Sequence, residues 1–304
     1  MSEPLRQKRQ RVLTRLRAEV KDVVVAFSGG VDSTLLLALA LEALGPERVV
    51  AVTAASESLP ASELSACRGL AKQLGARHEV FRTQELARPG YVANAGDRCY
   101  HCKTELFEVV ARKFAGRVVA YGATVDDFGD YRPGLVAAAE AGAIAPLAEA
   151  ELGKGEIRAL SRELGLPNWD KPAHPCLASR VPHGEVVSAA KLAMIEAAEA
   201  CLRARGFREF RVRHHELPSP TGVTHLARIE LLPQDLARFS GASDVSSELA
   251  ALGYTYVTLD LEGFRSGRLN DVLPAEASAG LPRAGLLRAG LLRAGAPRRL
   301  PVTS

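Results

Sequence analysis

At residues 28–33 the chain reads Ser28-Gly29-Gly30-Val31-Asp32-Ser33. An apolar run at residues 23–27 precedes this stretch, and a run rich in Leu and Ala, residues 34–44, follows it without Gly or Pro. The pattern predicts a buried strand, a tight glycine turn and a helix. Such a turn points backbone N–H groups and a helix N-terminus at one place, where an anionic group can bind. Two glycines allow close backbone approach and two serines add hydroxyl donors, so we expect a phosphate site here.

The stretch is not a Walker A loop, because no Gly-Lys-Ser/Thr follows at the required spacing, and it is not a dinucleotide GxGxxG pattern. It resembles the PP-loop of the N-type ATP pyrophosphatases. The resemblance implies that residues 28–33 hold the pyrophosphate of ATP while a substrate oxygen attacks the α-phosphate. It also implies that Asp32 helps to hold Mg²⁺, a cation that prefers hard oxygen ligands. The alternative is a glycine turn that merely links a strand to a helix.

The segments after this turn alternate between the two kinds of secondary structure. Strands are expected at residues 48–53, 78–81 and 117–121, and helices at 61–74 and 103–114. This order predicts an α/β fold, a parallel sheet with helices on both faces. Ligands of such sheets bind at the carboxyl ends of the strands, where the PP-loop lies.

The character of the chain changes near residue 187. A helix at 188–205, strands at 209–214, 223–231 and 254–259, and helices from about 233 and 246 predict a smaller α+β unit with an antiparallel sheet. The predicted domains are therefore residues 1–186 for the PP-loop unit and 187–272 for the smaller unit. Residues 273–304 repeat Leu-Leu-Arg-Ala-Gly and predict a disordered basic tail that is dispensable for chemistry.

Composition and charge limit the classes of function. The 304 residues are 47% hydrophobic and 24% charged, which is typical of a soluble globular protein. No apolar run is long enough to span a bilayer and the N-terminus resembles no signal peptide, so we expect a cytoplasmic protein without a membrane partner. The net charge is +4, but five arginines and no acids follow Glu276. Without these five charges the remainder carries −1, so the catalytic body gives no indication of nucleic-acid binding.

Three of the five cysteines form a candidate site. Cys99 and Cys102 form a CxxC pair, and Cys176 lies in a loop with four prolines at residues 165–184. We expect the pair to lie just before a helix, where the helix dipole and neighbouring cations favour thiolates. The thiols could hold three irons of a [4Fe–4S] cube, or a zinc ion with His101 or His174 as a fourth ligand. Cys67 and Cys201 lie within helical patterns and are expected to pack as small hydrophobes.

Taken together, the motifs at residues 28–33, 97–103 and 171–185 resemble the LarE family over about residues 23–264. The family makes the nickel-pincer nucleotide cofactor of lactate racemase: ATP adenylates a carboxylate of pyridinium-3,5-biscarboxylic acid mononucleotide, and sulfur displaces AMP. The resemblance implies a homohexamer and two possible sulfur sources. Either Cys176 gives up its own sulfur, or Cys99, Cys102 and Cys176 hold a [4Fe–4S] cluster that carries sulfide from solution or from a delivery protein. Because all three cysteines are present, we favour the cluster.

Other residues are candidates on chemical grounds. The guanidinium groups of Arg180, Arg211, Arg213 and Arg265 suit the substrate's phosphate or released pyrophosphate, although each could be an ordinary surface cation. The polar loop at 125–133 is either a substrate or pyrophosphate loop or a solvated connector. His214 and His215 are adjacent on an expected strand, so their side chains point to opposite faces.

Three other functions compete with this interpretation. A PP-loop tRNA thiolation enzyme would share the three cysteines but needs a basic RNA-binding surface. An amidotransferase such as GMP or NAD synthetase would share residues 28–33 but has no need of the cysteines. A non-catalytic nucleotide-binding protein would have a decayed site, whereas the PP-loop and the cysteines are intact here.

Overall fold

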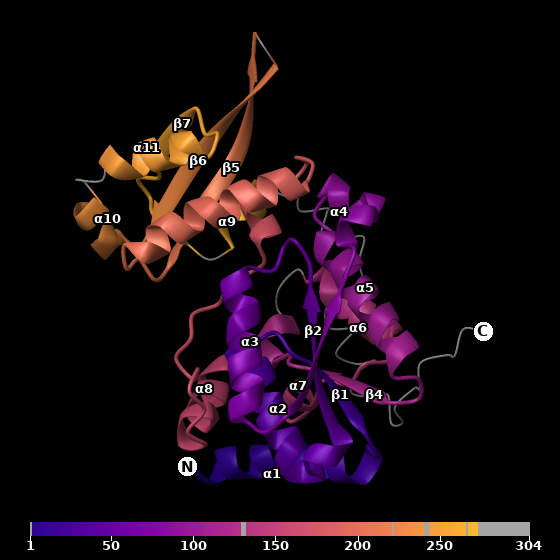
Figure 1. Ribbon diagram of the computed structural model, residues 1–304. Coiled ribbons are helices and arrows are strands. Elements are labelled where there is room, and N and C mark those ends of the chain that lie inside the picture. Colours follow the sequence, from indigo (N-terminus) through magenta and orange to yellow (C-terminus); the bar gives the residue numbers. More distant parts are fainter. Residues whose placement is uncertain (1, 129–131, 221, 240–242, 266, 273–304) are drawn as a thin grey trace.

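The computed structural model describes residues 2–128, 132–220, 222–239, 243–265 and 267–272. Its first sheet is wholly parallel, in the order β3-β2-β1-β4. The strands are β1 Val23–Ala26, β2 Val49–Ala55, β3 Arg77–Arg82 and β4 Val118–Tyr121. The helices of this unit are α1 Glu3–Glu19, α2 Val31–Leu44, α3 Ala61–Gln73, α4 Pro89–Ala93, α5 Arg98–Lys113, α6 Pro133–Glu140, α7 Pro146–Glu149 and α8 Lys154–Glu163. The predicted α/β fold is confirmed (Figure 1).

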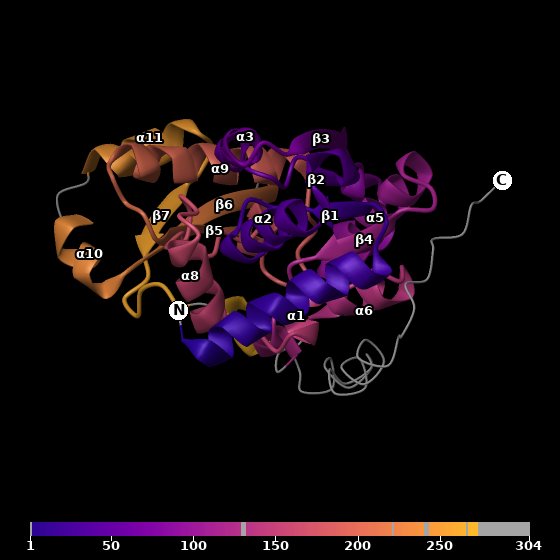
Figure 2. The same cartoon turned by 90° about the horizontal axis from the view of Figure 1, so that it is seen from below.

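Helices cover both faces of this sheet, which explains why β1, β2 and β4 read as largely apolar runs, whereas the edge strand β3 is polar. Successive side chains of a strand point to opposite faces. Val23 and Val25 of β1 pack into the cluster that includes residues of α1, α2, α3 and α8. Val24 and Ala26 pack into the cluster on the other face, with α5 and α6. Figure 2 shows α1 and α2 on one side of the strands and α5 on the other.

The carboxyl ends of β1 and β4 meet beside the PP-loop. β1 pairs with β2 on one side and with β4 on the other, so the chain reverses its direction of winding between β1 and β4. A Cβ at Gly122, directly after β4, would lie 2.9 Å from the Ser33 backbone nitrogen at the start of α2. Glycine therefore lets β4 approach the helix terminus, and it places the predicted phosphate site at the topological switch point.

The second unit packs its own sheet against a long helix. It comprises α9 Ala189–Ala204, β5 Phe210–Ser219, β6 Gly222–Leu231, α10 Pro233–Phe239, α11 Ser243–Ala251 and β7 Tyr256–Leu259. Figure 1 shows α9 along the side of this orange unit that faces the PP-loop unit. β5 and β6 are antiparallel as expected, but β7 runs parallel to β6. The prediction of an antiparallel sheet is thus wrong for β7, because the helical connection through α10 and α11 returns the chain in the same direction.

Among the described residues, no helix has both the length and the apolar character needed to cross a membrane. The tail predicted at residues 273–304 lies outside the described residues, and the domain boundary at residue 186 stays a prediction.

Close packing explains one glycine of the PP-loop. Gly29 has φ +66°, in the left-handed region, and a Cβ there would lie 2.8 Å from the Sγ of Cys67. Cys67 is completely buried in α3, which confirms its expected packing role. Gly30 has φ −77°, and a Cβ there would meet only the Ser28 hydroxyl at 3.4 Å. The two glycines thus face different constraints.

We therefore expect Gly29→Ala to lower the free energy of unfolding by about 2 kcal/mol or more, because both the backbone and Cys67 resist a methyl group. The matched variant Gly30→Ala should change it by less than about 1 kcal/mol. Urea unfolding of both variants without ligand measures the difference, and equal losses would contradict this account of Gly29.

Candidate active site

The PP-loop is held by its own serines. The Ser28 backbone N–H donates to the Ser33 hydroxyl at 3.3 Å, and that hydroxyl donates to the Gly30 carbonyl at 3.1 Å. The Ser28 and Ser33 hydroxyl oxygens are 3.2 Å apart. No side chain caps α2 at Gly30, so the first-turn N–H groups of this buried helix can serve an anion. The loop thus has the shape of a preformed phosphate cradle.

A mixed cluster of charges surrounds Asp32 at the start of α2. Burial and the nearby carboxylate of Asp127 raise the pKa of Asp32 to about 6, against the opposing effect of Lys154, Arg158 and Arg132. Asp127 is itself buried, accepts hydrogen bonds from the backbone and hydroxyl of Thr124, and forms an ion pair with Arg132 at 3.1 Å. Two carboxylates with three cations suit a triphosphate bound together with a hard divalent cation.

Part of the polar loop predicted at residues 125–133 belongs to this charge cluster. Residues 125–128 form a 3-10 turn, and Asp126 accepts a hydrogen bond from the Lys154 backbone N–H at the start of α8. Asp127 and Arg132 lie in the charge cluster beside the PP-loop. The fourth polar residue of that loop, Asp130, lies outside the described residues.

The loop that leads to Cys176 is attached directly to the PP-loop. The Asn168 side-chain amide donates to the Gly29 carbonyl at 3.1 Å and to the Thr34 hydroxyl at 3.0 Å. The Lys171 ammonium donates to the same Gly29 carbonyl at 3.2 Å and pairs with Glu63 at 2.7 Å. Two side chains of one loop therefore hold the backbone of Gly29 and tie the two motifs together.

The structure brings the three candidate cysteines into one neighbourhood. Cys102, near the start of α5, and Cys176 both pack against the buried cluster that contains Tyr91 and Leu177. Cys176 acts electrostatically on both Cys99 and Cys102, which shows that the thiols are close. Asn94 holds the segments in place, because its amide donates to the backbone carbonyls of residues 181, 182 and 185.

The expectation that these thiols are readily ionised is wrong. The CxxC pair lies within the first two turns of α5, which starts at Arg98, and not before the helix. Loss of surrounding water and the nearby Cys176 raise the pKa of Cys99, although part of this residue remains exposed. Burial likewise raises the pKa of Cys102, despite the opposing charge of Lys103. Desolvation outweighs the neighbouring cations, so both are neutral thiols at neutral pH unless a metal replaces the proton.

The spacing of the thiols bears on the metal that they could hold. A single tetrahedral zinc ion brings its thiolates to about 3.8 Å from one another, because each Zn–S bond is about 2.3 Å. Among the described residues, the three sulfur atoms do not all lie within 4.8 Å of one another. A cube with one iron for each cysteine spaces its ligands more widely. As they stand, the three thiols are therefore not gathered at the spacing of a single tetrahedral ion.

The histidines considered for zinc have other neighbours. His101 packs against Gly90 and lies 3.2 Å from a carboxylate oxygen of Asp97. Burial lowers the pKa of His174, which lies near Glu63 and Arg211. No group of three metal-binding side chains that includes His101 or His174 is found among the described residues.

Arg180 anchors the Cys176 loop from within. Its side chain is only 1% exposed and forms a bidentate ion pair with Glu199 of α9, at 2.7 and 2.9 Å. Its remaining terminal nitrogen donates to the carbonyls of Pro175 and Cys176 and to the Ser179 hydroxyl. These contacts engage the guanidinium fully, so Arg180 positions the loop in this structure.

The other candidate arginines divide into two groups. Arg211 and Arg213 are buried on β5 and donate to the carbonyls of Ala173 and Ser179, so they also contact the Cys176 loop. Burial and the nearby Arg180 lower the pKa of Arg211 to about 10. Arg213 forms an ion pair with Glu230 at 2.8 Å. Arg265 instead is exposed and pairs with Asp271 beyond β7.

Sequence reasoning missed several residues that build this site. Glu199 and Glu85 are buried carboxylates beside Arg180 and Cys102, whereas Asn94 and Asn168 are buried amides that join loops. The one available signal is polar residues in apolar surroundings, and it does not identify their partners, which lie 17 to 139 residues away along the chain. Glu230 of β6, the partner of Arg213, is also a completely buried carboxylate.

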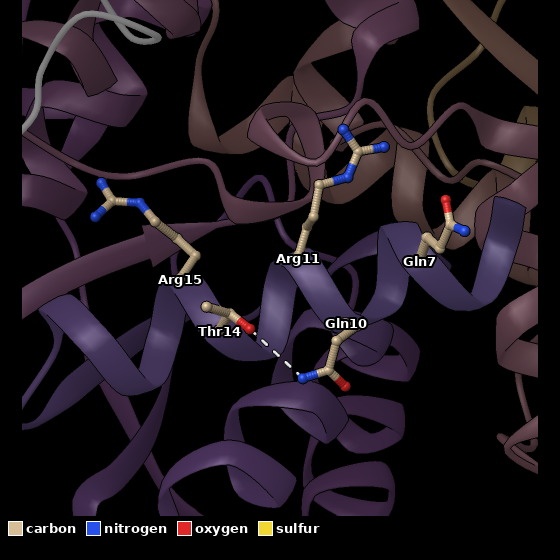
Figure 3. Close-up of a pocket in the computed structure, with 5 residues that line it drawn as sticks. All are labelled: Gln7, Gln10, Arg11, Thr14 and Arg15. Atoms are coloured by element: carbon tan, nitrogen blue, oxygen red, sulfur yellow. Dashed lines mark hydrogen bonds between the residues drawn. The ribbon is translucent and has the colours of Figure 1, made fainter.

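A separate depression lies along α1, and Figure 3 shows the five side chains that line it, Gln7, Gln10, Arg11, Thr14 and Arg15. Arg11 pairs with Glu151 at 3.4 Å and Arg15 with Glu149 at 2.6 Å. The Gln10 side chain donates to the Thr14 hydroxyl at 3.5 Å. None of these residues belongs to the PP-loop or to the cysteine group, so the depression lies outside the candidate site.

A parallel sheet that carries this loop at its switch point defines a PP-loop enzyme of the ATP pyrophosphatase class. In agreement, residues 8–111 match the NAD synthase family. An NH(3)-dependent NAD(+) synthetase of Hyperthermus butylicus is 42% identical over 74 residues, which are 24% of this chain and 27% of the synthetase.

Two relatives match far more of the chain. An uncharacterized protein of Synechocystis is 44% identical over 86% of this chain and 96% of its own length. The pyridinium-3,5-bisthiocarboxylic acid mononucleotide synthase of Lactiplantibacillus plantarum is 41% identical over 85% of this chain and 93% of its own length. The chain belongs to the LarE family of sulfurtransferases, as the motifs predicted.

The raised pKa of Asp32 has a measurable effect on stability. A carboxyl group with a higher pKa in the folded protein stabilises the fold at low pH, and this contribution is lost as the pH rises through about 6. Asp32→Asn removes the charge. In ligand-free protein, its free energy of unfolding relative to that of the wild type should therefore increase by about 1–3 kcal/mol as the pH is raised from 4 to 8. Urea unfolding across this range tests the effect, and a difference independent of pH would contradict it.

Removal of Arg180 should be far more damaging than removal of Arg265. Arg180→Met leaves the Glu199 carboxylate buried without its bidentate partner, at a cost of about 3–5 kcal/mol. Arg265→Met removes an exposed pair worth less than about 1 kcal/mol. The double variant Arg180→Met with Glu199→Leu should recover much of the loss. Equal thermal stability of the two single variants would rule out the anchoring role.

Proposed function

We propose that the protein inserts sulfur into pyridinium-3,5-biscarboxylic acid mononucleotide, with consumption of ATP, in the synthesis of the nickel-pincer nucleotide cofactor. One observation carries the proposal: the similarity to the Lactiplantibacillus synthase spans nearly the whole of both chains. The geometry supports it, because the PP-loop and the three cysteines meet through the loop that includes Lys171 and Cys176. Lactate racemization would be the process served.

The first half of the reaction is adenylation. A substrate carboxylate oxygen attacks the α-phosphorus of ATP, the bond to the β-phosphate oxygen breaks, and pyrophosphate leaves. The N–H groups at the start of α2 and the hydroxyls of Ser28 and Ser33 would hold the leaving pyrophosphate. Asp32 and Asp127 would share a Mg²⁺ ion, whose charge favours the ionised form of both. Arg132, whose charge acts on both Asp32 and Cys99, would lie between the two half-reactions.

The second half replaces AMP by sulfur. A sulfide sulfur attacks the carbonyl carbon of the acyl adenylate, the bond from carbon to the AMP oxygen breaks, and a thiocarboxylate and a proton result. Repetition on the second carboxylate gives the bisthiocarboxylate named for the relative. Burial beside Tyr91 and Leu177 would keep water, the competing nucleophile, away from the adenylate.

Cys99, Cys102 and Cys176 would hold a [4Fe–4S] cluster; Cys102 and Cys176 pack against one buried cluster of side chains, and Cys99 lies near Cys176, which supports a shared site. Such a cluster supplies an open iron that can carry an external sulfide. The alternative is that the Cys176 thiolate attacks the adenylate itself. The Cys176 Cβ–S bond would then break with loss of the Cα proton and leave dehydroalanine.

We also propose that Arg211 and Arg213 contribute to the phosphate site of the substrate, since both lie against the Cys176 loop. Arg180 is in the same region, and Arg265 follows Phe264, whose ring centroid lies 4.6 Å from the Arg211 guanidinium. The homohexamer and the source of sulfide, free or from a delivery protein, stay predictions.

The number of catalytic cycles that each polypeptide completes distinguishes the two sulfur sources. Protein purified without oxygen and reconstituted with iron and sulfide would receive ATP, Mg²⁺, the biscarboxylate nucleotide and excess sulfide. We expect many thiocarboxylates and AMP molecules per chain, with the mass of the polypeptide unchanged. One thiocarboxylate per chain, with loss of the Cys176 sulfur, would overturn the cluster, and no AMP with this substrate would overturn the function itself.

Cys102→Ser and Cys201→Ser provide the matched comparison. Cys201 lies in the smaller unit, at the edge of its hydrophobic cluster, so Cys201→Ser should keep multiple turnover. Cys102→Ser should abolish it by removing one iron ligand. If Cys176 is the donor instead, Cys102→Ser should retain its single turnover.

A further inference from the structure

Three side chains on the β5–β6 hairpin form a cluster that the reaction above does not use. Glu216 of β5 is paired with His225 of β6 across the hairpin. His214 lies two residues before Glu216, so its side chain is on the same face of the strand. One potential ligand atom from each residue lies within 4.8 Å of the other two. Among the described residues, no other three side chains of His, Cys, Asp or Glu meet this criterion.

The histidines of this cluster present buried nitrogens without partners. His214 is completely buried, and its Nδ1 lies 3.2 Å from the Tyr254 hydroxyl. Its Nε2 is buried and has no hydrogen-bond partner among the described residues, and the same is true of Nδ1 of His225. A buried polar atom without a partner costs about 1–3 kcal/mol, so two of them in contacting rings require an explanation. The ring centroids are 4.9 Å apart.

We propose that His214, Glu216 and His225 bind a divalent transition-metal ion of the class of Zn²⁺. Two imidazoles and one carboxylate are a ligand set that suits this class, whereas Mg²⁺ and Ca²⁺ prefer oxygen ligands alone. The Tyr254 hydroxyl on the second nitrogen of His214 would orient the ring, as outer partners of metal-binding histidines do. A fourth position would remain for water.

The surrounding charges are compatible with such an ion. Burial and the neighbouring His225 lower the pKa of His214 to about 4, so the imidazole is neutral at neutral pH, the form that binds metals. Lys191 of α9 pairs with one carboxylate oxygen of Glu216 at 2.8 Å, and the ion would take the other. Glu216 would thus be shared between an ammonium and a metal, which weakens binding relative to an unshared carboxylate.

Binding of the ion would require the three ligand atoms to move only slightly closer together. Nitrogen and oxygen ligands about 2.0–2.2 Å from zinc lie about 3.3–3.5 Å from one another in a tetrahedron, less than the present limit of 4.8 Å. Glu216 and His225 are half-buried, so their side chains have room to turn toward His214. The ion would cross-link β5 and β6, the two strands of the hairpin drawn in Figure 1, close to Lys191 of α9.

Metal titration of tag-free, chelator-stripped protein tests the proposal. We expect one Zn²⁺ equivalent that Glu216→Gln and His225→Gln weaken at least tenfold, together with a higher melting temperature of the wild type when Zn²⁺ is added. The control is His215→Gln, on the opposite face of β5, where the His215 ring contacts Arg228; it should bind Zn²⁺ like the wild type. Co²⁺ in place of Zn²⁺ should show d–d absorption that these two substitutions remove, without the charge-transfer band of a thiolate ligand.

The overturning results are equally specific. Equal affinity of His215→Gln, Glu216→Gln and His225→Gln would mean that the metal binds elsewhere. Only thiolate-bound Co²⁺ would assign it to the cysteines, and no binding at all would leave a trapped water as the partner of the two nitrogens. If His225→Gln does not fold by circular dichroism, Glu216→Gln decides, because it keeps the shape of the side chain. The assay does not measure sulfur transfer, so its result is independent of the proposed function.

Discussion

The buried ion pair between Arg180 and Glu199 is the constraint on which the geometry of the site depends. Two charges removed from water are tolerated only when hydrogen bonds replace their hydration, and here the protein supplies them from three directions. Arg180 binds carbonyls of the Cys176 loop, while Glu199 of α9 also accepts a hydrogen bond from the Val212 N–H of β5. Loop, helix and strand all contact this pair, so the pair holds the Cys176 loop against α9 and β5.

The same loop determines how the two halves of the site meet. Before it reaches Cys176, it binds the Gly29 carbonyl through Asn168 and Lys171, and after Cys176 it is held to the start of α5 through Asn94. In the proposed reaction, adenylation and sulfur transfer occur at the same substrate carboxylate, so a rigid connection between the phosphate cradle and the cysteines would serve both steps. Strain or loss of either anchor would misplace one half-reaction relative to the other.

Several buried ionisable or polar side chains lack a favourable partner in the protein, and they lie where a bound cation would supply one. Asp32 has a raised pKa beside Asp127, the thiols of Cys99 and Cys102 are held neutral, and His214 has a buried nitrogen without a partner. Each would gain from a cation: Mg²⁺ at the carboxylates, iron at the thiols, a zinc-like ion at the imidazoles. This pattern is typical of functional sites, because groups that only stabilise a fold are paired within it.

The sequence by itself determined the local elements and the chemistry they carry. The glycine turn between an apolar run and a helix, the strand–helix alternation and the CxxC spacing depend on contacts within a few residues, so the α/β fold and the family could be predicted. Only the tertiary structure decided the direction of β7, the raised thiol pKa values, and the attachment of Arg180 to Glu199 and of Asn168 to Gly29. It also placed His214 beside His225. The sequence predicted only that the side chains of His214 and His215 point to opposite faces of a strand. These features depend on burial and on partners far away along the chain, which local patterns do not encode.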